Sequence, residues 1–422
     1  MRSASATSAV LVGCGLLLAA SSLRAQDWPQ WRGPNRDARV TGFKAPREWP
    51  KELTKKWKVK VGEGVATPAL VGDRLYVFVR EGGDEVIRCL DAGNGKELWQ
   101  DKYPAKAPTR PGSGFNNEFV GPRASPAVAD GKVVTYGASG ILSCYDAASG
   151  KRLWRKDDFK GSWPRFFTSS SPMIVGGLVI AQLGGEGKGD GGMIAYDLAT
   201  GEEKWKWTGD GTAYASPVLL AADGVKAVIA EAAHNVVAVN ARDGKLLWKT
   251  SLVAQRMSYN ACTPMVVEGQ TVIWSGSGQG TKAVRLEKKG DELAAKELWT
   301  NPESVQFNTP VVKDGFVYGI SNRNQLFCIN ARDGKTAWTR PLGAGGGGRR
   351  GPSGYGSVVD AGPVLFALTP SAELVVFATG GKEFKEVAKY KVADSQTYAY
   401  PVVSGNRVFV KDRDSLTLWT IE

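Results

Sequence analysis

Histidine and cysteine are scarce in this chain of 422 residues, and their scarcity argues against several kinds of site. His234 is the single histidine, which argues against a serine–histidine–aspartate triad and against a zinc site with several histidine ligands. Five cysteines are present, but none are adjacent, and the C-x-x-C and C-x-x-C-H spacings do not occur. We therefore expect neither a metal site nor covalently attached haem.

Long apolar runs are also rare. The best candidate, Ala9–Ala20, follows Arg2 and precedes small and polar residues that end at Ala25. This run is too short to span a bilayer, and its flanks are typical of a secretory signal peptide. We assign residues 1–25 to the signal and expect a periplasmic or secreted protein with no transmembrane span. An alternative is lipidation at Cys14 in an outer-membrane lipoprotein, although the apolar run continues beyond that cysteine.

A turn-and-strand pattern returns along the rest of the chain. Each copy has an Asp or Asn that opens a turn, then a Gly, then a short run that ends in Trp, which is typical of a hairpin. Self-similarity at this period indicates an array of small units that bury their apolar faces against one another. The copies are Cys89–Trp99, Cys144–Trp154, Ala195–Trp205, Ala238–Trp248 and Cys328–Trp338.

A second landmark, a Ser-Pro or Thr-Pro step, runs in phase with the first. From Pro126 to Pro310 these steps are separated by 46, 45, 47 and 46 residues. Apolar runs split by a Gly-containing turn follow each step, so each unit indicates four short strands, as in a propeller blade. The steps fall at Thr67-Pro68, Ser125-Pro126, Ser171-Pro172, Ser216-Pro217, Thr263-Pro264 and Thr309-Pro310, with Tyr400-Pro401 as a variant.

These landmarks predict an all-β fold, an eight-bladed β-propeller with four antiparallel strands in each blade. The eighth blade is too short for four strands, and Leu53–Gly62 supplies its missing outer strand, which closes the ring and protects the sheet edges. Residues 53–422 then form the propeller of a monomer, and residues 26–52 an extended segment before it. We expect removal of Gln26–Glu48 to be tolerated. The blades begin near Val65, Arg123, Thr168, Ala213, Asn260, Asn308, Gly354 and Tyr398.

The repeated tryptophans and cysteines are best explained by packing. The tryptophans hold one place in the repeat and are expected to wedge between adjacent blades. Equivalent strands of neighbouring blades lie too far apart for a disulfide, so the cysteines are expected to be small buried side chains. The structural tryptophans are Trp99, Trp154, Trp205, Trp248, Trp299 and Trp338.

The D-x-x-x-G-K-x-x-W pattern with its Ser/Thr-Pro steps resembles the repeats of pyrroloquinoline-quinone-type β-propellers. In that family, tryptophan-docking repeats hold adjacent blades together. The opening sequence QDWPQWRGPNRD (Gln26–Asp37) also resembles the mature start of a secreted branch of the family. The resemblance implies a propeller, but its members include quinoprotein dehydrogenases and non-catalytic scaffolds, among them a lipoprotein of the outer-membrane β-barrel assembly machinery.

The dehydrogenases of this family hold their quinone with a Ca²⁺ ion, and many carry two adjacent cysteines over it. This chain has no adjacent cysteines and lacks long insertions between its blades. Ca²⁺ requires six to eight oxygen ligands, and the candidates Glu231, Asn260, Asn308 and Asp360 form no recognisable loop. We expect no cofactor and no catalysis. A pyrroloquinoline-quinone-dependent dehydrogenase with calcium is the alternative.

The function predicted from the sequence is a non-catalytic binding or scaffold propeller of the cell envelope. Large or polar residues precede the Ser/Thr-Pro steps, so they are expected to converge at the mouth of the channel and to engage a protein, a peptide or a glycan. The alternative is that they plug the channel. Nucleic acid is not expected, because the positive charge, +12 in total, is dispersed along a secreted chain. The candidate residues are Arg123, Phe167, Tyr214, Tyr259, Asn260, Phe307, Asn308, Arg349, Arg350, Tyr355 and Tyr398, with the Gly343–Gly354 loop as a lid.

Overall fold

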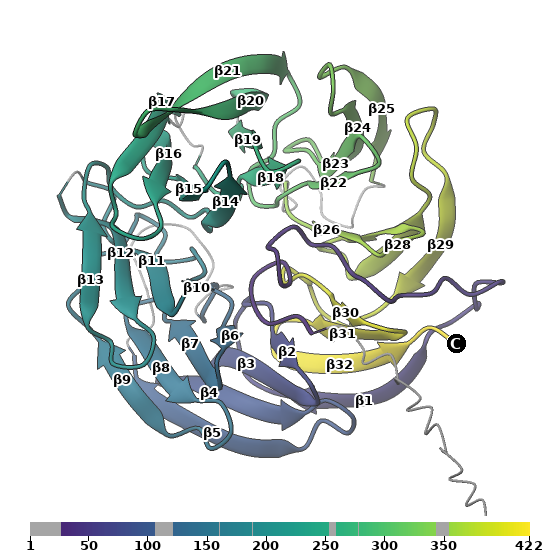
Figure 1. Ribbon diagram of the computed structural model, residues 1–422. Coiled ribbons are helices and arrows are strands. Elements are labelled where there is room, and N and C mark those ends of the chain that lie inside the picture. The colour runs from purple at the N-terminus through teal and green to yellow at the C-terminus, as the bar shows by residue number, and fades with distance from the viewer. Residues whose placement is uncertain are drawn as a thin grey trace, which may run out of the picture.

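The computed structural model describes residues 27–105, 121–159, 161–187, 189–252, 259–276, 278–342 and 354–422. These residues form eight antiparallel sheets of four strands each, arranged in a ring (Figure 1), which confirms the predicted eight-bladed propeller. No helix within these ranges is long and apolar enough to cross a membrane. The expected signal peptide, Cys14, Arg349 and Arg350 lie outside the described residues.

The first four blades follow one another along the chain, each running from the channel to the rim. Blade one is β2 (Ala69–Val71), β3 (Arg74–Glu81), β4 (Asp84–Asp91) and β5 (Glu97–Pro104). Blade two is β6 (Ala127–Ala129), β7 (Lys132–Tyr136), β8 (Leu142–Asp146) and β9 (Arg152–Lys156). Blade three is β10 (Met173–Val175), β11 (Leu178–Gly184), β12 (Gly191–Asp197) and β13 (Glu203–Trp207). Blade four is β14 (Val218–Ala222), β15 (Val225–Glu231), β16 (Asn235–Asn240) and β17 (Leu246–Ser251).

The remaining blades repeat this plan, and the last one takes a strand from the other end of the chain. Blade five is β18 (Met265–Val267), β19 (Thr271–Gly276), β20 (Gly280–Lys289) and β21 (Glu292–Asn301). Blade six is β22 (Val311–Lys313), β23 (Phe316–Ile320), β24 (Gln325–Asn330) and β25 (Thr336–Pro341). Blade seven is β26 (Ser357–Asp360), β27 (Leu365–Leu368), β28 (Glu373–Phe377) and β29 (Glu386–Lys391). Blade eight is β30 (Val402–Ser404), β31 (Arg407–Lys411), β32 (Ser415–Thr420) and β1 (Thr54–Lys60).

The ring closes where the two ends of the chain share one sheet. β1 pairs antiparallel with β32, from Thr54 opposite Thr420 to Lys60 opposite Ser415. The sheet order β30-β31-β32-β1 makes the N-terminal strand the outermost one, as the sequence predicted. The indole N–H of Trp57 in β1 then donates to the carbonyl of Ala92 in blade one, 3.2 Å away, which ties the last blade to the first.

Tryptophans of the outer strands join neighbouring blades. The indole N–H of Trp99 donates to the Ala147 carbonyl at 3.2 Å, and that of Trp154 to the Leu198 carbonyl at 3.0 Å. The repeat glycine of the next blade lies under the ring, and a Cβ on Gly150 would come within 2.5 Å of Trp99. Three further tryptophans donate in the same way, Trp205 to Ala241, Trp299 to Ala331 and Trp338 to Gly380. Trp248 packs against Trp274 with ring centroids 6.2 Å apart.

The hydroxyls of the Ser/Thr-Pro steps form a second set of links, next to the channel. The backbone N–H of Thr67 donates to the Ser125 hydroxyl, and that of Ser125 to the Ser171 hydroxyl. Ser171 N–H donates in turn to the Ser216 hydroxyl in the next blade. Each buried N–H is thereby satisfied by the neighbouring blade. The same link joins Thr263 to Thr309 and Tyr400 to Thr67.

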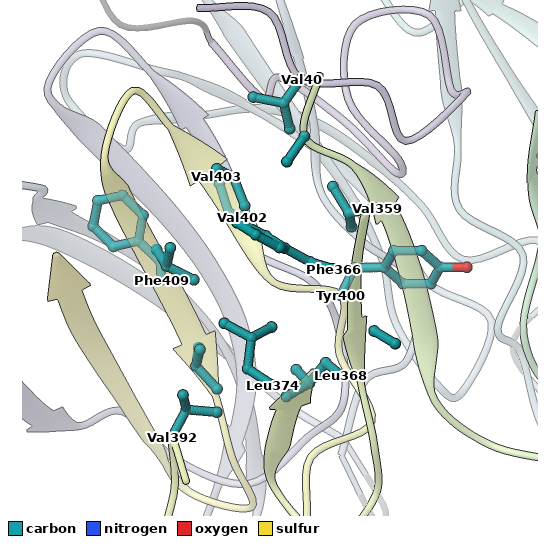
Figure 2. Close-up of a cluster of buried hydrophobic side chains, with 14 of the residues drawn as sticks. Val40, Val359, Phe366, Leu368, Leu374, Val392, Tyr400, Val402, Val403 and Phe409 are labelled. Atoms are coloured by element: carbon teal, nitrogen blue, oxygen red, sulfur yellow. The ribbon is translucent and has the colours of Figure 1, made fainter. Parts of the chain in front are cut away.

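The segment before β1 enters the centre of the ring and does not lie loosely over one face. It is the purple trace that lies across the inner strands in Figure 1. Trp28 exchanges two backbone hydrogen bonds with Leu70, and Val40 donates its N–H to the Asp360 carbonyl. Figure 2 shows Val40 in the same apolar cluster as Val359 and Phe366 of blade seven. The centre of the propeller is therefore filled from one end by its own N-terminal segment.

Candidate functional site

Six aromatic side chains, each from the segment that leads into one of blades three to eight, form a continuous series. Their ring centroids lie 4.8 Å apart for Phe166 and Tyr259, 6.4 Å for Tyr259 and Phe307, and 4.4 Å for Phe307 and Tyr355. All six are half-buried, so each keeps part of its surface in solvent. We call this set the aromatic arc, and it comprises Phe166, Tyr214, Tyr259, Phe307, Tyr355 and Tyr398.

The arc contains Phe166 where the sequence led us to name Phe167. Phe167 is buried, has a left-handed backbone with φ of 70°, and packs against Trp163 with centroids 5.4 Å apart. Its N–H bonds to the Pro164 carbonyl, so a tight turn precedes the inner strand here. Counting back from the Ser-Pro step misses Phe166 because this turn places it six residues before Pro172, whereas Tyr214 lies three before Pro217.

Two arginines lie at the arc. Arg123 of blade two donates through Nη1 to the Phe166 carbonyl. Burial lowers the pKa of Arg123, and the phenols of Tyr355 and Tyr214 oppose that shift. The guanidinium of Arg165, which we did not predict from the sequence, lies 5.4 Å from the Phe166 ring centroid.

The arc is held by a carboxylate at one end. The Tyr214 hydroxyl donates to Oε1 of Glu186 at 2.8 Å, and the backbone N–H of Arg165 donates to the same oxygen at 3.0 Å. The Tyr214 hydroxyl also accepts the Phe166 N–H at 3.1 Å. Burial, followed by the Glu186 charge, raises the pKa of Tyr214 above its usual range, so this phenol stays protonated and keeps donating.

Asn260 and Asn308 are buried beside the arc and brace the backbone. Nδ2 of Asn260 donates to the carbonyls of Ala232 and Leu252, at 2.9 and 2.8 Å. Nδ2 of Asn308 donates to the Ile320 carbonyl at 2.7 Å. These two side chains position the segments that carry Tyr259 and Phe307, because they join them to neighbouring loops.

The four residues nominated as calcium ligands belong to, or lead into, four different blades. The Nδ2 groups of Asn260 and Asn308 donate to carbonyls, and Oδ1 of Asn308 has no hydrogen-bond partner among the described residues. Asp360 pairs with Lys313 at 3.3 Å. Glu231 lies in β15, and its carboxyl oxygens have no hydrogen-bond partner among the described residues. No group of three or more acidic, histidine or cysteine side chains able to hold a metal occurs within the described ranges. These donors do not supply the six to eight oxygen ligands that Ca²⁺ requires.

Glu231 instead occupies a repeat position whose side chain bonds to the next blade in blades three and eight. It lies two residues after Ile229, which pairs with the inner strand β14, and Gln182 and Lys411 have the same register in blades three and eight. Gln182 donates to the Ala215 carbonyl of the following blade, and Lys411 to the Gly62 and Gly64 carbonyls. Burial raises the pKa of Glu231 well above its ordinary value of 4.5, so the carboxyl is neutral over a wide pH range.

A Glu231→Gln substitution should remove one source of pH dependence in folding. A carboxyl whose pKa is raised by folding contributes stability below pH 4.5, and this contribution is lost as pH rises through the folded-state pKa. The unfolding free energy of Glu231→Gln, measured in urea from pH 4 to 9, should therefore exceed that of the parent increasingly toward high pH. The exposed substitution Glu268→Gln is the control. A constant difference across the pH range would contradict the prediction.

The fold and its inter-blade links define a closed propeller built from one repeated unit, with an aromatic arc before the inner strands. Residues 37–188 and 83–340 match the family model described as outer membrane protein assembly factor BamB, which together covers more than half of the chain. The chain therefore belongs to this family of pyrroloquinoline-quinone-like β-propellers.

Two kinds of protein within this fold are similar in sequence. A quinohemoprotein alcohol dehydrogenase from Comamonas testosteroni is 28% identical over 209 residues, which are 48% of this chain and 28% of that protein. Outer membrane protein assembly factor BamB from Yersinia pestis is 26% identical over 250 residues, 56% of this chain and 60% of that protein. The chain thus matches less than two thirds of the length of either relative.

Solved structures agree on the fold. BamB from Moraxella catarrhalis has a TM-score of 0.62 at 16% identity and covers 87% of this chain and 100% of its own. The quinohemoprotein alcohol dehydrogenase from Comamonas testosteroni has a TM-score of 0.67 at 15% identity, with 95% of this chain and 81% of its own covered. At these identities the likeness concerns the architecture alone.

Proposed function

We propose that this protein is a non-catalytic binding or scaffold propeller of the cell envelope that engages a partner through the aromatic arc. The observation that carries the proposal is the arc itself, because six contiguous and partly exposed aromatic side chains exceed what blade packing requires. Aromatic and arginine side chains are enriched where proteins bind partners tightly. The similarity to BamB, named an outer membrane protein assembly factor, supports a periplasmic or outer-membrane-associated protein.

Photo-crosslinking tests this proposal directly. A Phe307→p-benzoylphenylalanine variant, irradiated in intact cells, should give a discrete adduct with an envelope component that mass spectrometry identifies. The same photoreactive residue at Leu98, an exposed position on the outer strand β5, is the matched control. We expect the adduct from position 307 to disappear when Tyr214 and Tyr398 are also replaced by Ala. Equal adducts from both positions, or none from position 307, would refute the proposal.

Asn308 is not a suitable position for this test. Its side chain is buried and donates to the carbonyls of Ile320 and Gly354, so Asn308→Ala would weaken the fold together with any binding. Tyr214 and Tyr398 are half-buried, and both precede the inner strands of their blades, so their replacement leaves the strand residues unchanged. The Tyr398→Ala variant should keep the melting temperature within a few degrees of the parent, about the shift that 1 kcal/mol produces. Tyr214→Ala should lower it further, because the Phe166 N–H and Glu186 lose the Tyr214 hydroxyl.

A quinone-dependent dehydrogenase is the second candidate, and the similarity to quinohemoprotein alcohol dehydrogenases is the observation that favours it. The four nominated calcium ligands oppose this candidate, because they come from four different blades and Asp360 is paired with Lys313. Incubation with pyrroloquinoline quinone and Ca²⁺, followed by dye-linked assays with alcohols and sugars, separates the two candidates. Reproducible turnover would replace the scaffold proposal with an enzymatic one.

A further inference from the structure

The chemistry at the arc indicates the kind of partner that it fits. Arg165 is exposed, and its guanidinium lies over the Phe166 ring. Its positive charge also lowers the pKa of Tyr259, which burial raises, so the charge acts on a second ring of the arc. A cation is therefore held over exposed aromatic surface by a cation–π contact. A guanidinium in this position favours a planar anion such as a carboxylate.

The arrangement of the rings favours the same conclusion. Phe307 and Tyr355 stack with an interplanar angle of 16°, and Tyr259 and Phe307 stack at 24°. Tyr398 meets the Tyr355 ring at 75°. Tyr259, Phe307 and Tyr355 thus stack face against face, whereas a sugar would need an open face for its apolar C–H groups.

A carboxylate already lies at one end of the arc, but it is engaged. Oε1 of Glu186 accepts hydrogen bonds from the Tyr214 hydroxyl and from the backbone N–H of Arg165. Two donors thus already satisfy the Glu186 oxygen that faces the arc, and the guanidinium of Arg165 lies over Phe166. The net charge of the chain, +12, adds a long-range attraction for acidic partners.

We propose that the aromatic arc recognises an acidic segment of a partner polypeptide, whose carboxylates pair with Arg165 and whose apolar side chains pack on the arc. This inference rests on the proposed function and names the chemistry of its partner. The arc extends from blade three to blade eight, so the bound segment lies extended around the channel mouth and contacts several blades at once.

Fluorescence anisotropy with two labelled peptides tests the inference on the purified full chain. One hexapeptide alternates Glu and Phe, and the other alternates Gln and Phe, so the pair differs only in charge. We expect the acidic peptide to bind roughly 10- to 100-fold more tightly, the range for hydrogen bonds to charged groups. Arg165→Gln should remove most of this preference and Arg165→Lys should retain part of it. Arg242→Gln, an equal charge change in the exposed turn between β16 and β17, should leave it unchanged.

Equal affinity for the two peptides, or a preference that survives Arg165→Gln, would overturn the inference. Tighter binding of an oligogalacturonate of similar charge would also overturn it, in favour of an acidic glycan. The outcomes remain separable from those of the proposed function. If crosslinking from position 307 captures a partner while the acidic peptide shows no preference, the binding role stands and the acidic segment is wrong.

Discussion

A chain that begins at Glu63 should not unfold cooperatively, because it lacks the strand that closes the ring. β1 supplies the outer strand of blade eight, and Trp57 bonds this blade to the Ala92 carbonyl of blade one. Without it, β32 becomes an open edge and the inter-blade contact is lost. The expected loss of unfolding free energy is comparable to the whole stability of a typical domain, about 5–15 kcal/mol. Urea unfolding followed by tryptophan fluorescence and circular dichroism measures it.

Two further truncations complete this series. A chain that begins at Asp27 keeps every described residue and should unfold in one sharp transition. A chain that begins at Leu53 keeps β1 but loses the segment that fills the channel, so it should unfold cooperatively at a clearly lower urea concentration. From the sequence we expected this segment to be dispensable, and its buried contacts with Leu70 and Asp360 oppose that expectation. Sharp unfolding of the Glu63 chain at the parental midpoint would show that ring closure does not depend on β1.

Arg32→Ala should destabilise the protein by roughly 3–5 kcal/mol, since each buried acceptor left without a partner costs about 1–3 kcal/mol. The side chain of Arg32 is fully buried. Nη1 donates to the Thr309 carbonyl and to the Tyr400 hydroxyl, at 2.7 and 3.0 Å, and Nη2 donates to the Pro310 carbonyl at 2.7 Å. One guanidinium therefore joins the N-terminal segment to blades six and eight. The unfolding free energy in urea is the measurement.

Arg39→Ala is the matched control for this prediction. Arg39 belongs to the same segment, but its side chain is 66% exposed and its contact with Asp360 is long, at 3.8 Å. We expect a change within about 0.5 kcal/mol. The unfolding free energy of Arg32→Lys should lie between those of the two alanine variants, because an ammonium keeps the charge but cannot reproduce the planar fork of the guanidinium. If Arg32→Ala and Arg39→Ala behave alike, the segment does not stabilise the channel.

The repeated features of the fold were accessible from the sequence because their signals are local and recur. Gly150 and its equivalents mark a turn that requires positive φ, and the Trp that ends each run marks an outer strand. Eight copies of one supersecondary unit leave little choice of architecture. The truncated last blade likewise indicated that Leu53–Gly62 closes the ring, because a blade with a missing outer strand exposes an edge.

Only some residues of the candidate site could be predicted from the sequence. The spacing from the Ser/Thr-Pro steps located Tyr214, Phe307 and Tyr398, since these residues keep the register of the repeat. It named Phe167 in place of Phe166, because a tight turn after Pro164 changes the offset in blade three. Arg165 carries no repeat signal at all, and its place over the Phe166 ring follows from the conformation of that turn.

The sequence by itself determined the class of fold and the number of blades, because each depends on a unit that recurs about every 45 residues. It also determined the place of closure, because the last unit lacks one strand and Leu53–Gly62 belongs to no other blade. The tertiary structure alone decided what fills the centre of the ring. Arg32 and Arg36 occur in a short segment with no repeat, and from the sequence they look like ordinary surface charges. Their bonding partners, the carbonyls at Ser171, Pro172, Thr309 and Pro310, converge only when the blades close into a ring. Buried guanidinium groups need several acceptors at once, and only the closed ring brings these acceptors together.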